Sequence, residues 1–269
     1  MNEDPELSVV LPCYKSAAIA RRSAERLAGF LERGRLRWEL IVVDDGGGDF
    51  GAGPWDAAEG VTLLRLPRNR GKGAAVRAGM QAARGAARVF TDVDLPYDLE
   101  LIPLVAHYLL ESDFHLVIGD RRLPDSSYDA PVSFGRQLGS AVFSQVFGRL
   151  VTSNFFDTQC GLKGFRGDVA EALFARARLD GFAFDVELLY LALKNRLEIK
   201  RIPVQLRHNE TSSVRLVRDG LAMARDVLRI KGHQLRGLYD SPELARLACD
   251  DVARARAGLD ASERARGVS

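Results

Sequence analysis

Several features are scarce in this sequence, and each scarcity excludes a class of protein. The 269 residues include three cysteines, Cys13, Cys160 and Cys249, too few and too widely spaced for a disulfide framework or a cysteine metal site. No window approaches the roughly 18 apolar residues that a membrane-spanning helix needs. The formal net charge is only +2, with no basic run interleaved with aromatics, so a nucleic-acid partner is not expected. The first residues lack the apolar segment of a signal peptide, and we therefore expect a cytoplasmic protein.

Apolar residues make up 46% of the chain, enough for a substantial core. Short apolar runs alternate with helical stretches, which predicts an α/β fold with a mostly parallel sheet flanked by helices. The loops at the carboxyl ends of such strands line one crevice, the usual ligand position. Strands are expected at 7–11, 38–43, 61–66, 89–91, 115–118 and 199–206 and in a unit ending near Phe165, and helices at 16–33, 74–84, 98–111, 134–151, 168–176 and 185–194.

Two acids follow the expected strand at 89–91. Asp92 and Asp94 are separated by one residue, so their carboxylates point to the same side of an extended chain. Mg2+ and Mn2+ prefer such oxygens, and Mg2+ binds one or two carboxylates together with phosphate groups. The pattern predicts a metal–diphosphate site, and the alternative is that Asp94 is a turn or N-cap residue before Pro96.

The character of the sequence changes after residue 210, so we divide the chain into 1–210 and a C-terminal loop with amphipathic helices at 211–269. An apolar side and an arginine side are expected in the helix that begins near Leu216. Residues 207–236 hold seven Lys or Arg against three acids, a balance that anionic lipid would favour. The last helices could serve as a lid, contact a membrane surface, form a homodimer, or simply pack on their own domain.

Five motifs follow one another in order along the sequence. They are Val-Val-Leu-Pro-Cys-Tyr at 9–14, Glu-Leu-Ile-Val-Val-Asp-Asp-Gly at 39–46, Asn-Arg-Gly-Lys-Gly at 69–73, Thr-Asp-Val-Asp-Leu at 91–95 and Asp-Thr-Gln-Cys-Gly-Leu-Lys at 157–163, with Phe-Asp-Val-Glu-Leu-Leu at 184–189 in support. With these motifs the chain resembles the inverting GT-A (Rossmann-like) glycosyltransferases of family 2, and within them the polyprenyl-phosphate hexosyltransferases of the dolichyl-phosphate glucosyltransferase and mannosyltransferase type.

The resemblance implies a role for particular residues. The nucleoside would lie against the ends of the first two strands, and the diphosphate with its Mg2+ or Mn2+ against Asp92 and Asp94, with Asp94 the more direct ligand. Guanidinium groups suit the phosphates of donor and acceptor because they offer paired hydrogen-bond donors. The residues implied in nucleotide, diphosphate or acceptor binding are Pro12, Tyr14, Val43, Asp45, Gly71, Lys72, Asp92, Val93, Asp94, Arg121, Arg122, Arg136, Ser140, Ser212 and Arg215.

The activity implied by the resemblance is transfer of a hexose, with glucose from UDP-glucose favoured, to a polyprenyl phosphate. A phosphate acceptor is already anionic and needs little general-base help, whereas a hydroxyl acceptor would need a carboxylate such as Asp157 or Asp185. Four alternatives stay open: a GDP-mannose donor, a soluble hydroxyl acceptor, a sugar nucleotidyltransferase, and a non-catalytic nucleotide-sugar-binding protein. The enzyme would be cytoplasmic, or peripheral at the inner face of the membrane.

Overall fold

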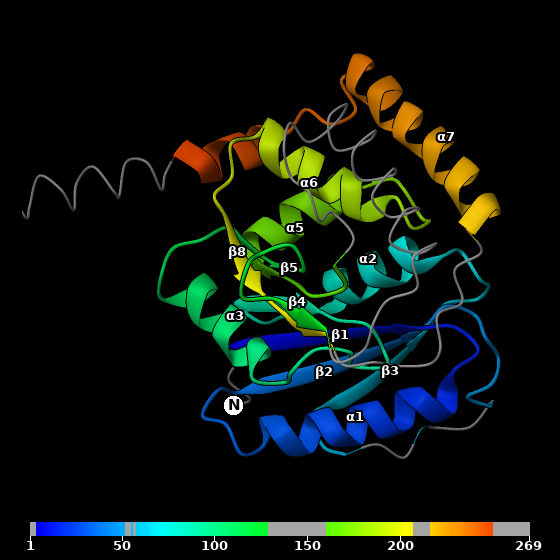
Figure 1. Ribbon diagram of the computed structural model, residues 1–269, viewed down its shortest axis with the longest axis vertical. Coiled ribbons are helices and arrows are strands. Elements are labelled where there is room, and N and C mark those ends of the chain that lie inside the picture. Colours follow the sequence, from blue (N-terminus) through cyan, green and yellow to red (C-terminus); the bar gives the residue numbers. More distant parts are fainter. Residues whose placement is uncertain (1–3, 52–54, 56–57, 129–159, 207–215, 250–269) are drawn as a thin grey trace, which may run out of the picture.

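A seven-stranded sheet forms the centre of the protein (Figure 1). The computed structural model describes residues 4–51, 55, 58–128, 160–206 and 216–249. The strand order is β3-β2-β1-β4-β7-β5-β8, and a separate two-stranded sheet pairs β6 with β9. The strands are β1 (Leu7–Cys13), β2 (Trp38–Asp44), β3 (Val61–Arg65), β4 (Ala87–Phe90), β5 (Leu116–Asp120), β6 (Ser127–Tyr128), β7 (Lys163–Arg166), β8 (Ile199–Pro203) and β9 (Gln205–Leu206).

One strand runs against the others. β7 is antiparallel to both of its neighbours, β4 and β5, whereas the other strand pairs of this sheet are parallel. Its first residue, Lys163, lies opposite Phe90 of β4 and Ile118 of β5. The beginning of β7 therefore lies at the edge where β4 and β5 end. The predicted mostly parallel α/β sheet is confirmed.

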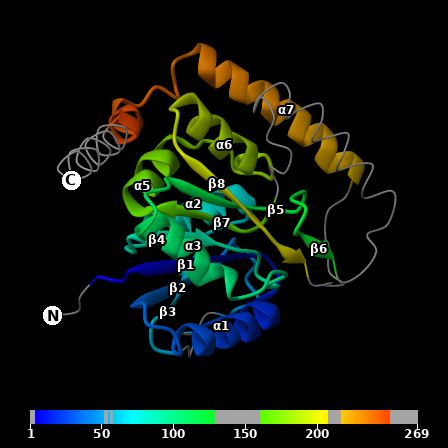
Figure 2. The same ribbon diagram turned by 60° about the vertical axis from the view of Figure 1, so that its left-hand side comes forward.

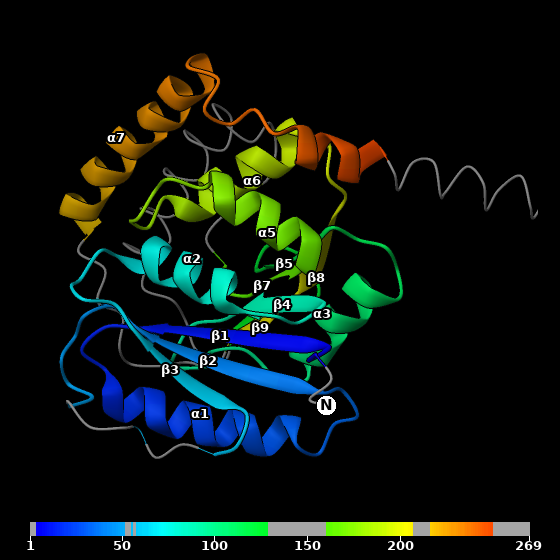
Figure 3. The same ribbon diagram turned by 180° about the vertical axis from the view of Figure 1, so that it is seen from behind.

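Helices cover both faces of this sheet because side chains alternate along its strands. In β1, Val9 and Leu11 pack with α1 (Ala17–Leu31) and α3 (Leu101–Leu110) on one face. Val10 points to the other face, which is covered by α2 (Lys72–Ala82), α5 (Gly167–Arg176) and α6 (Phe184–Lys194). Figure 3 shows α1 below the sheet and the second group of helices above it. The result is a three-layer arrangement with two cores.

The C-terminal segment packs on the second core. Helix α7 (Leu216–Leu235) lies along the outside of α6, and a short helix at 242–249 follows (Figure 2). Ile230, Tyr239 and Leu244 are fully buried in the same core as Phe184. Leu228 on α7 is 72% exposed, so this helix also presents an apolar side chain to solvent. Among the described residues, none of the helices combines the length and the apolarity needed to cross a membrane.

Most expected elements are found within a few residues of their predicted bounds. The expected strand at 199–206 is divided by Val204 into β8 and β9, which belong to different sheets. The helix expected at 134–151 lies outside the described residues.

Candidate functional site

The carboxyl ends of the central strands bring charged side chains together at one edge of the sheet. Asp45 follows β2, Asp92 follows β4, and Arg121 follows β5. Lys163 joins them from the beginning of the antiparallel β7. Parallel strands end at the same edge, and this brings sequence-distant motifs together there.

Asp92 is held between a lysine and a glycine. Its Oδ1 accepts a hydrogen bond from Lys72 Nζ at 2.6 Å. A Cβ atom at Gly161 would lie only 1.9 Å from Asp92 Oδ2, so no larger residue fits there without displacing the carboxylate. Burial would raise the pKa of Asp92, but Lys72, Lys163 and Arg121 outweigh it and lower the pKa. The carboxylate is therefore ionised and firmly placed.

Lys72 comes from the first turn of α2 and carries the matching positive charge. Burial alone would lower its pKa, yet the carboxylates of Asp92 and Asp185 raise the pKa above the ordinary lysine value. Its side chain is 22% exposed, so part of it reaches solvent at this edge of the sheet. An ammonium group in this position can also donate to a phosphate oxygen.

A second ion pair lies beneath the first. Lys163 is fully buried, and its Nζ donates to Asp185 Oδ1 at 2.7 Å and to the carbonyl oxygen of Cys160 at 2.6 Å. Burial raises the pKa of Asp185, although Lys163 and Lys72 oppose that rise. Two lysines and two aspartates therefore form one compact charge cluster. The role of Asp185 as a catalytic base stays a prediction, and the structure places it in a buried ion pair.

The loop before α2 is fixed by Asp45. The two carboxylate oxygens of Asp45 accept the backbone N–H groups of Arg70 at 2.9 Å and Gly71 at 2.7 Å. Gly71 has a φ of 113°, and a Cβ atom there would lie 2.5 Å from the carbonyl oxygen of Asp180. Burial raises the pKa of Asp45, while these two N–H groups lower it. Asp45, expected at the nucleoside, thus supports the loop that carries Lys72.

The two arginines after β5 differ in their surroundings. Arg121 follows directly on β5, and its positive charge contributes to the lowered pKa of Asp92. The side chain of Arg122 is exposed, and its backbone N–H donates to Asp120 Oδ1 at 2.9 Å. Asp120 also accepts a hydrogen bond from Arg201 Nε at 2.6 Å. Of the two arginines, Arg121 is the one whose charge lowers the pKa of Asp92.

The end of β1 supplies the remaining described residues expected at the nucleotide. Pro12 is buried, whereas Tyr14 is 44% exposed just beyond the strand. The side chain of Val43 is fully buried in the core shared with α2. Only the backbone of Val43 is therefore left for contact with a nucleotide. Val93 and Asp94 are half-buried in the turn after Asp92. Five further expected site residues lie outside the described residues: Arg136, Ser140, Asp157, Ser212 and Arg215.

The sequence did not single out Lys163, Tyr97 and Gly161 as site residues. Lys163 could have been found as a lysine inside an apolar strand. A lysine that is buried in this way requires a charged or polar partner. Tyr97 is buried, and its hydroxyl oxygen accepts the Gly161 N–H at 3.1 Å. No sequence pattern indicated that contact, since it depends on the direction of β7. Nothing in the described residues groups three or more His, Cys, Asp or Glu side chains as a metal site.

Comparison with known proteins identifies similar sequences over most of the chain. The family model described as Glycosyl transferase family 2 matches residues 8–174. A dolichyl-phosphate beta-glucosyltransferase of Dictyostelium discoideum is 30% identical over 251 residues, covering 87% of this chain and 76% of that protein. The protein of the same name from Drosophila melanogaster is 32% identical, with 87% and 77% covered.

Solved structures share the fold at lower sequence identity. Glucosyl-3-phosphoglycerate synthase from Mycobacterium tuberculosis, in complex with Mn2+, UDP and glucosyl-3-phosphoglycerate, is 21% identical with a TM-score of 0.57, and the match covers 84% of this chain and 78% of that one. Mannosyl-3-phosphoglycerate synthase from Rubrobacter xylanophilus is 17% identical with a TM-score of 0.57, covering 86% and 74%.

Proposed function

Because the chain belongs to glycosyl transferase family 2, we propose that it transfers glucose from UDP-glucose to a polyprenyl phosphate with inversion at the anomeric carbon. Relatives named dolichyl-phosphate beta-glucosyltransferase, at 30% and 32% identity, support glucose as the sugar and a polyprenyl phosphate as the acceptor, and UDP bound to a solved structure of the same fold supports the choice of nucleotide. The structural observation that carries the proposal is the Lys72–Asp92 pair at the carboxyl edge of the sheet, where Arg121 also follows β5. Cations placed around a strand-end acid pair suit a diphosphate leaving group.

The donor would lie across the ends of β1, β2 and β4. We assign the nucleoside to Pro12 and Tyr14, with the backbone of Val43 beside it, and the diphosphate to the loop of Gly71 and Lys72. Asp45 would act there by holding that loop through two backbone N–H groups. A lysine ammonium and the Arg121 guanidinium can both donate to phosphate oxygens.

The acid pair fits a divalent cation bound together with the donor. Mg2+ needs only one or two carboxylates when diphosphate oxygens and water supply the other ligands, so the absence of a three-residue cluster among the described residues is compatible with it. The family resemblance implies Asp94 as the more direct protein ligand, with Asp92, which binds Lys72 through Oδ1, beside it. Bound Mg2+ or Mn2+ would offset negative charge on the diphosphate.

The transfer itself is a single displacement. An oxygen of the acceptor phosphate forms a bond to the anomeric carbon while the bond from that carbon to the UDP oxygen breaks, and UDP leaves. Lys72 and Arg121 stabilise the charge that grows on UDP. The acceptor oxygen is already ionised, so no proton must be removed. With a hydroxyl acceptor, Asp157 would be the first residue to test as a base and Asp185 the second.

Helix α7 provides a surface for contact with a membrane. Leu228 and Leu235 are 72% and 87% exposed, and the side chains of Arg225 and Arg229 on the same helix are 70% and 58% exposed. Exposed leucines next to arginines favour the surface of an anionic bilayer. We propose peripheral attachment at the cytoplasmic face, where the lipid acceptor would be accessible.

The test is UDP release by the purified protein with UDP-glucose, Mg2+ or Mn2+, and a short polyprenyl phosphate. Acceptor-dependent release that falls at least a hundredfold in Asp94→Asn, and that chelation with EDTA abolishes, would support the proposal. Asp113→Asn is the matched control, because Asp113 is exposed in the turn before β5 and has a φ of 55° that asparagine tolerates. Its activity should equal that of the wild type.

The same assay separates the alternatives. Release of GDP from GDP-mannose, with no release of UDP from UDP-glucose, would change the proposed donor and leave the proposed chemistry intact. Stimulation by 3-phosphoglycerate and not by the lipid phosphate would indicate a soluble acceptor. Donor binding without release for any acceptor would refute the enzyme and leave a nucleotide-sugar-binding protein.

A further inference from the structure

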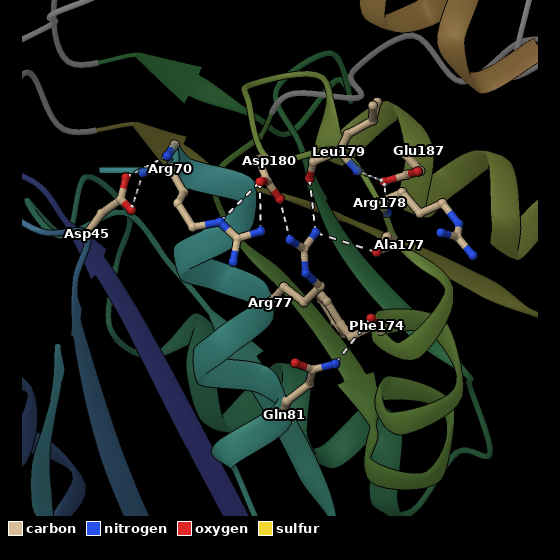
Figure 4. A network of polar contacts seen from close by, with 11 residues as sticks. Asp45, Arg70, Arg77, Gln81, Phe174, Ala177, Arg178, Leu179, Asp180 and Glu187 are labelled. Carbon is tan, nitrogen blue, oxygen red and sulfur yellow. Dashed lines mark hydrogen bonds and ion pairs between the residues drawn. The ribbon is translucent and has the colours of Figure 1, made fainter. Parts of the chain in front are cut away.

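Helix α2 is joined to the last turn of α5 and to the segment between α5 and α6 by a row of polar contacts (Figure 4). Gln81 Nε2 donates to the carbonyl oxygen of Phe174 at 3.4 Å. One turn earlier, Arg77 Nη1 donates to the carbonyl oxygens of Ala177 at 3.5 Å and Leu179 at 3.3 Å. These contacts lead along α2 to its first turn, where the loop of residues 70–73 enters the functional site.

Asp180 is at the end of this row and binds two arginines. Its Oδ2 accepts from Arg70 Nε at 3.2 Å and Nη2 at 2.9 Å, and its Oδ1 accepts from Arg77 Nη2. Burial would raise the pKa of Asp180, but Arg77 and Arg70 lower it, so the carboxylate stays ionised. Figure 4 shows both guanidinium groups directed at this carboxylate from the side of α2. Without it, two positive charges would face each other across the beginning of the helix.

The backbone of residue 180 also contacts the loop. Its carbonyl oxygen accepts the Ala74 N–H at 3.2 Å and lies against Gly71, where a Cβ atom would come within 2.5 Å. On the opposite side, Asp45 binds the N–H groups of Arg70 and Gly71. The loop is therefore held between two carboxylates, Asp45 from β2 and Asp180 from the segment before α6. Lys72 extends from this loop to Asp92.

We propose that Asp180 is a positioning residue for the donor diphosphate, because its pairs with Arg70 and Arg77 hold the 70–73 loop where Lys72 meets Asp92. Asp180 itself does not touch the donor. A lysine side chain has a flexible four-carbon stem, so the place of its ammonium group depends on a fixed backbone. The inference rests on the proposed function for the identity of the ligand, but the placement of Lys72 can be measured without any ligand.

The first measurement is the rate at which the Lys72 amine is acetylated by an N-hydroxysuccinimide ester, followed by mass spectrometry. In Asp180→Asn we expect Lys72 to be labelled about tenfold faster, because loss of the charge-assisted bonds frees the loop and with it the ammonium group. Asp168→Asn is the matched control, since it removes the Arg166–Asp168 ion pair at 2.9 Å at the other edge of the sheet. This control variant should leave the labelling of Lys72 unchanged. The labelling of Lys194 should be the same in every variant.

The second measurement is UDP binding by calorimetry in the presence of Mn2+. We expect the dissociation constant to rise about tenfold in Asp180→Asn and to stay at the wild-type value in Asp168→Asn. Arg70→Gln removes the arginine of the Arg70–Asp180 ion pair and should change Lys72 labelling and UDP binding in the same direction. This second variant keeps the test open if Asp180→Asn does not fold, which circular dichroism will show.

The outcomes distinguish this inference from the proposed function. Unchanged Lys72 labelling in both variants would overturn the positioning role, and so would faster labelling with unchanged UDP affinity. If the variants are labelled faster but the wild type binds no UDP, the proposed donor is wrong, whereas the role of Asp180 in holding the loop is retained. Faster labelling with weaker UDP binding would support both.

Discussion

Lys163 and Asp185 form the most deeply buried ion pair of the site, and replacing Lys163 by methionine tests what the pair contributes. The side chain of Lys163 has no exposed surface and that of Asp185 has 5%. Breaking such a pair leaves one charge without its partner, at a cost of about 3–5 kcal/mol in the free energy of unfolding. For a protein of this size we therefore expect Lys163→Met to lower the melting temperature by roughly 6–20 °C.

The loss should depend on pH, because the remaining carboxyl can become neutral. Burial already raises the pKa of Asp185, and Lys163 and Lys72 oppose that rise. Removing Lys163 raises the pKa further above the unfolded value. A raised folded-state pKa contributes stability that is fully present below the unfolded pKa and is lost as the pH rises through the folded pKa. Relative to the wild type, Lys163→Met should thus lose more stability at pH 8 than at pH 5.

Thermal unfolding followed by circular dichroism measures the effect in four proteins: the wild type, Lys163→Met, Asp185→Asn, and the double variant that carries both substitutions. The double variant has no buried charge at either position, so we expect it to regain most of the lost stability. A different result would refute the structural role: Asp185→Asn with the wild-type melting temperature but turnover at least ~100-fold lower would identify Asp185 as a catalytic base.

Three further predictions concern other parts of the protein. Glu187 accepts the N–H groups of Arg178 and Leu179 and the hydroxyl of Tyr239, so Glu187→Ala should cost about 2–4 kcal/mol in urea unfolding, whereas Glu187→Gln retains the contacts and should cost under about 1 kcal/mol. Gly161→Ala should weaken UDP binding at least tenfold with little loss of stability, because its Cβ would displace the Asp92 carboxylate, and calorimetry checks this. Leu228→Glu should reduce sedimentation with phosphatidylglycerol vesicles, whereas Leu104→Glu on α3 should not, and equal losses would argue against attachment through α7.

The sequence predicted the strands and the edge at which they end, because buried parallel strands are continuous apolar runs that stop at polar residues. The Asp92–Asp94 pattern lies at that edge, as expected for acids that follow a buried strand, and its role in metal binding stays a prediction. The direction of β7 could not be predicted, since the run at 163–166 reads the same for a parallel or an antiparallel strand. The position of Lys163 depends on that direction, and so the second ion pair was missed.

The contacts of Asp180 were equally inaccessible from the sequence. Arg70 and Arg77 lie more than a hundred positions from Asp180 along the chain, and nothing local marks an aspartate between two helices as their partner. Asp45 is a different case: its place at the end of β2 was predicted, but its binding to the backbone of Arg70 and Gly71 required the fold of the loop. The roles of Arg136, Ser140, Asp157, Ser212 and Arg215 stay predictions.

The reversed direction of β7 has a consequence for how such a protein can change during evolution. The chain leaves the sheet at Asp120 and re-enters it at Lys163, and both points lie at the same edge because β5 and β7 are antiparallel neighbours. A connecting segment whose two ends lie side by side can be lengthened, shortened or replaced without moving any strand. Lengthening it costs little entropy. Under the proposed function, the acceptor side can therefore change at this point of the chain while β1, β2 and β4, to which we assign the donor, keep their places.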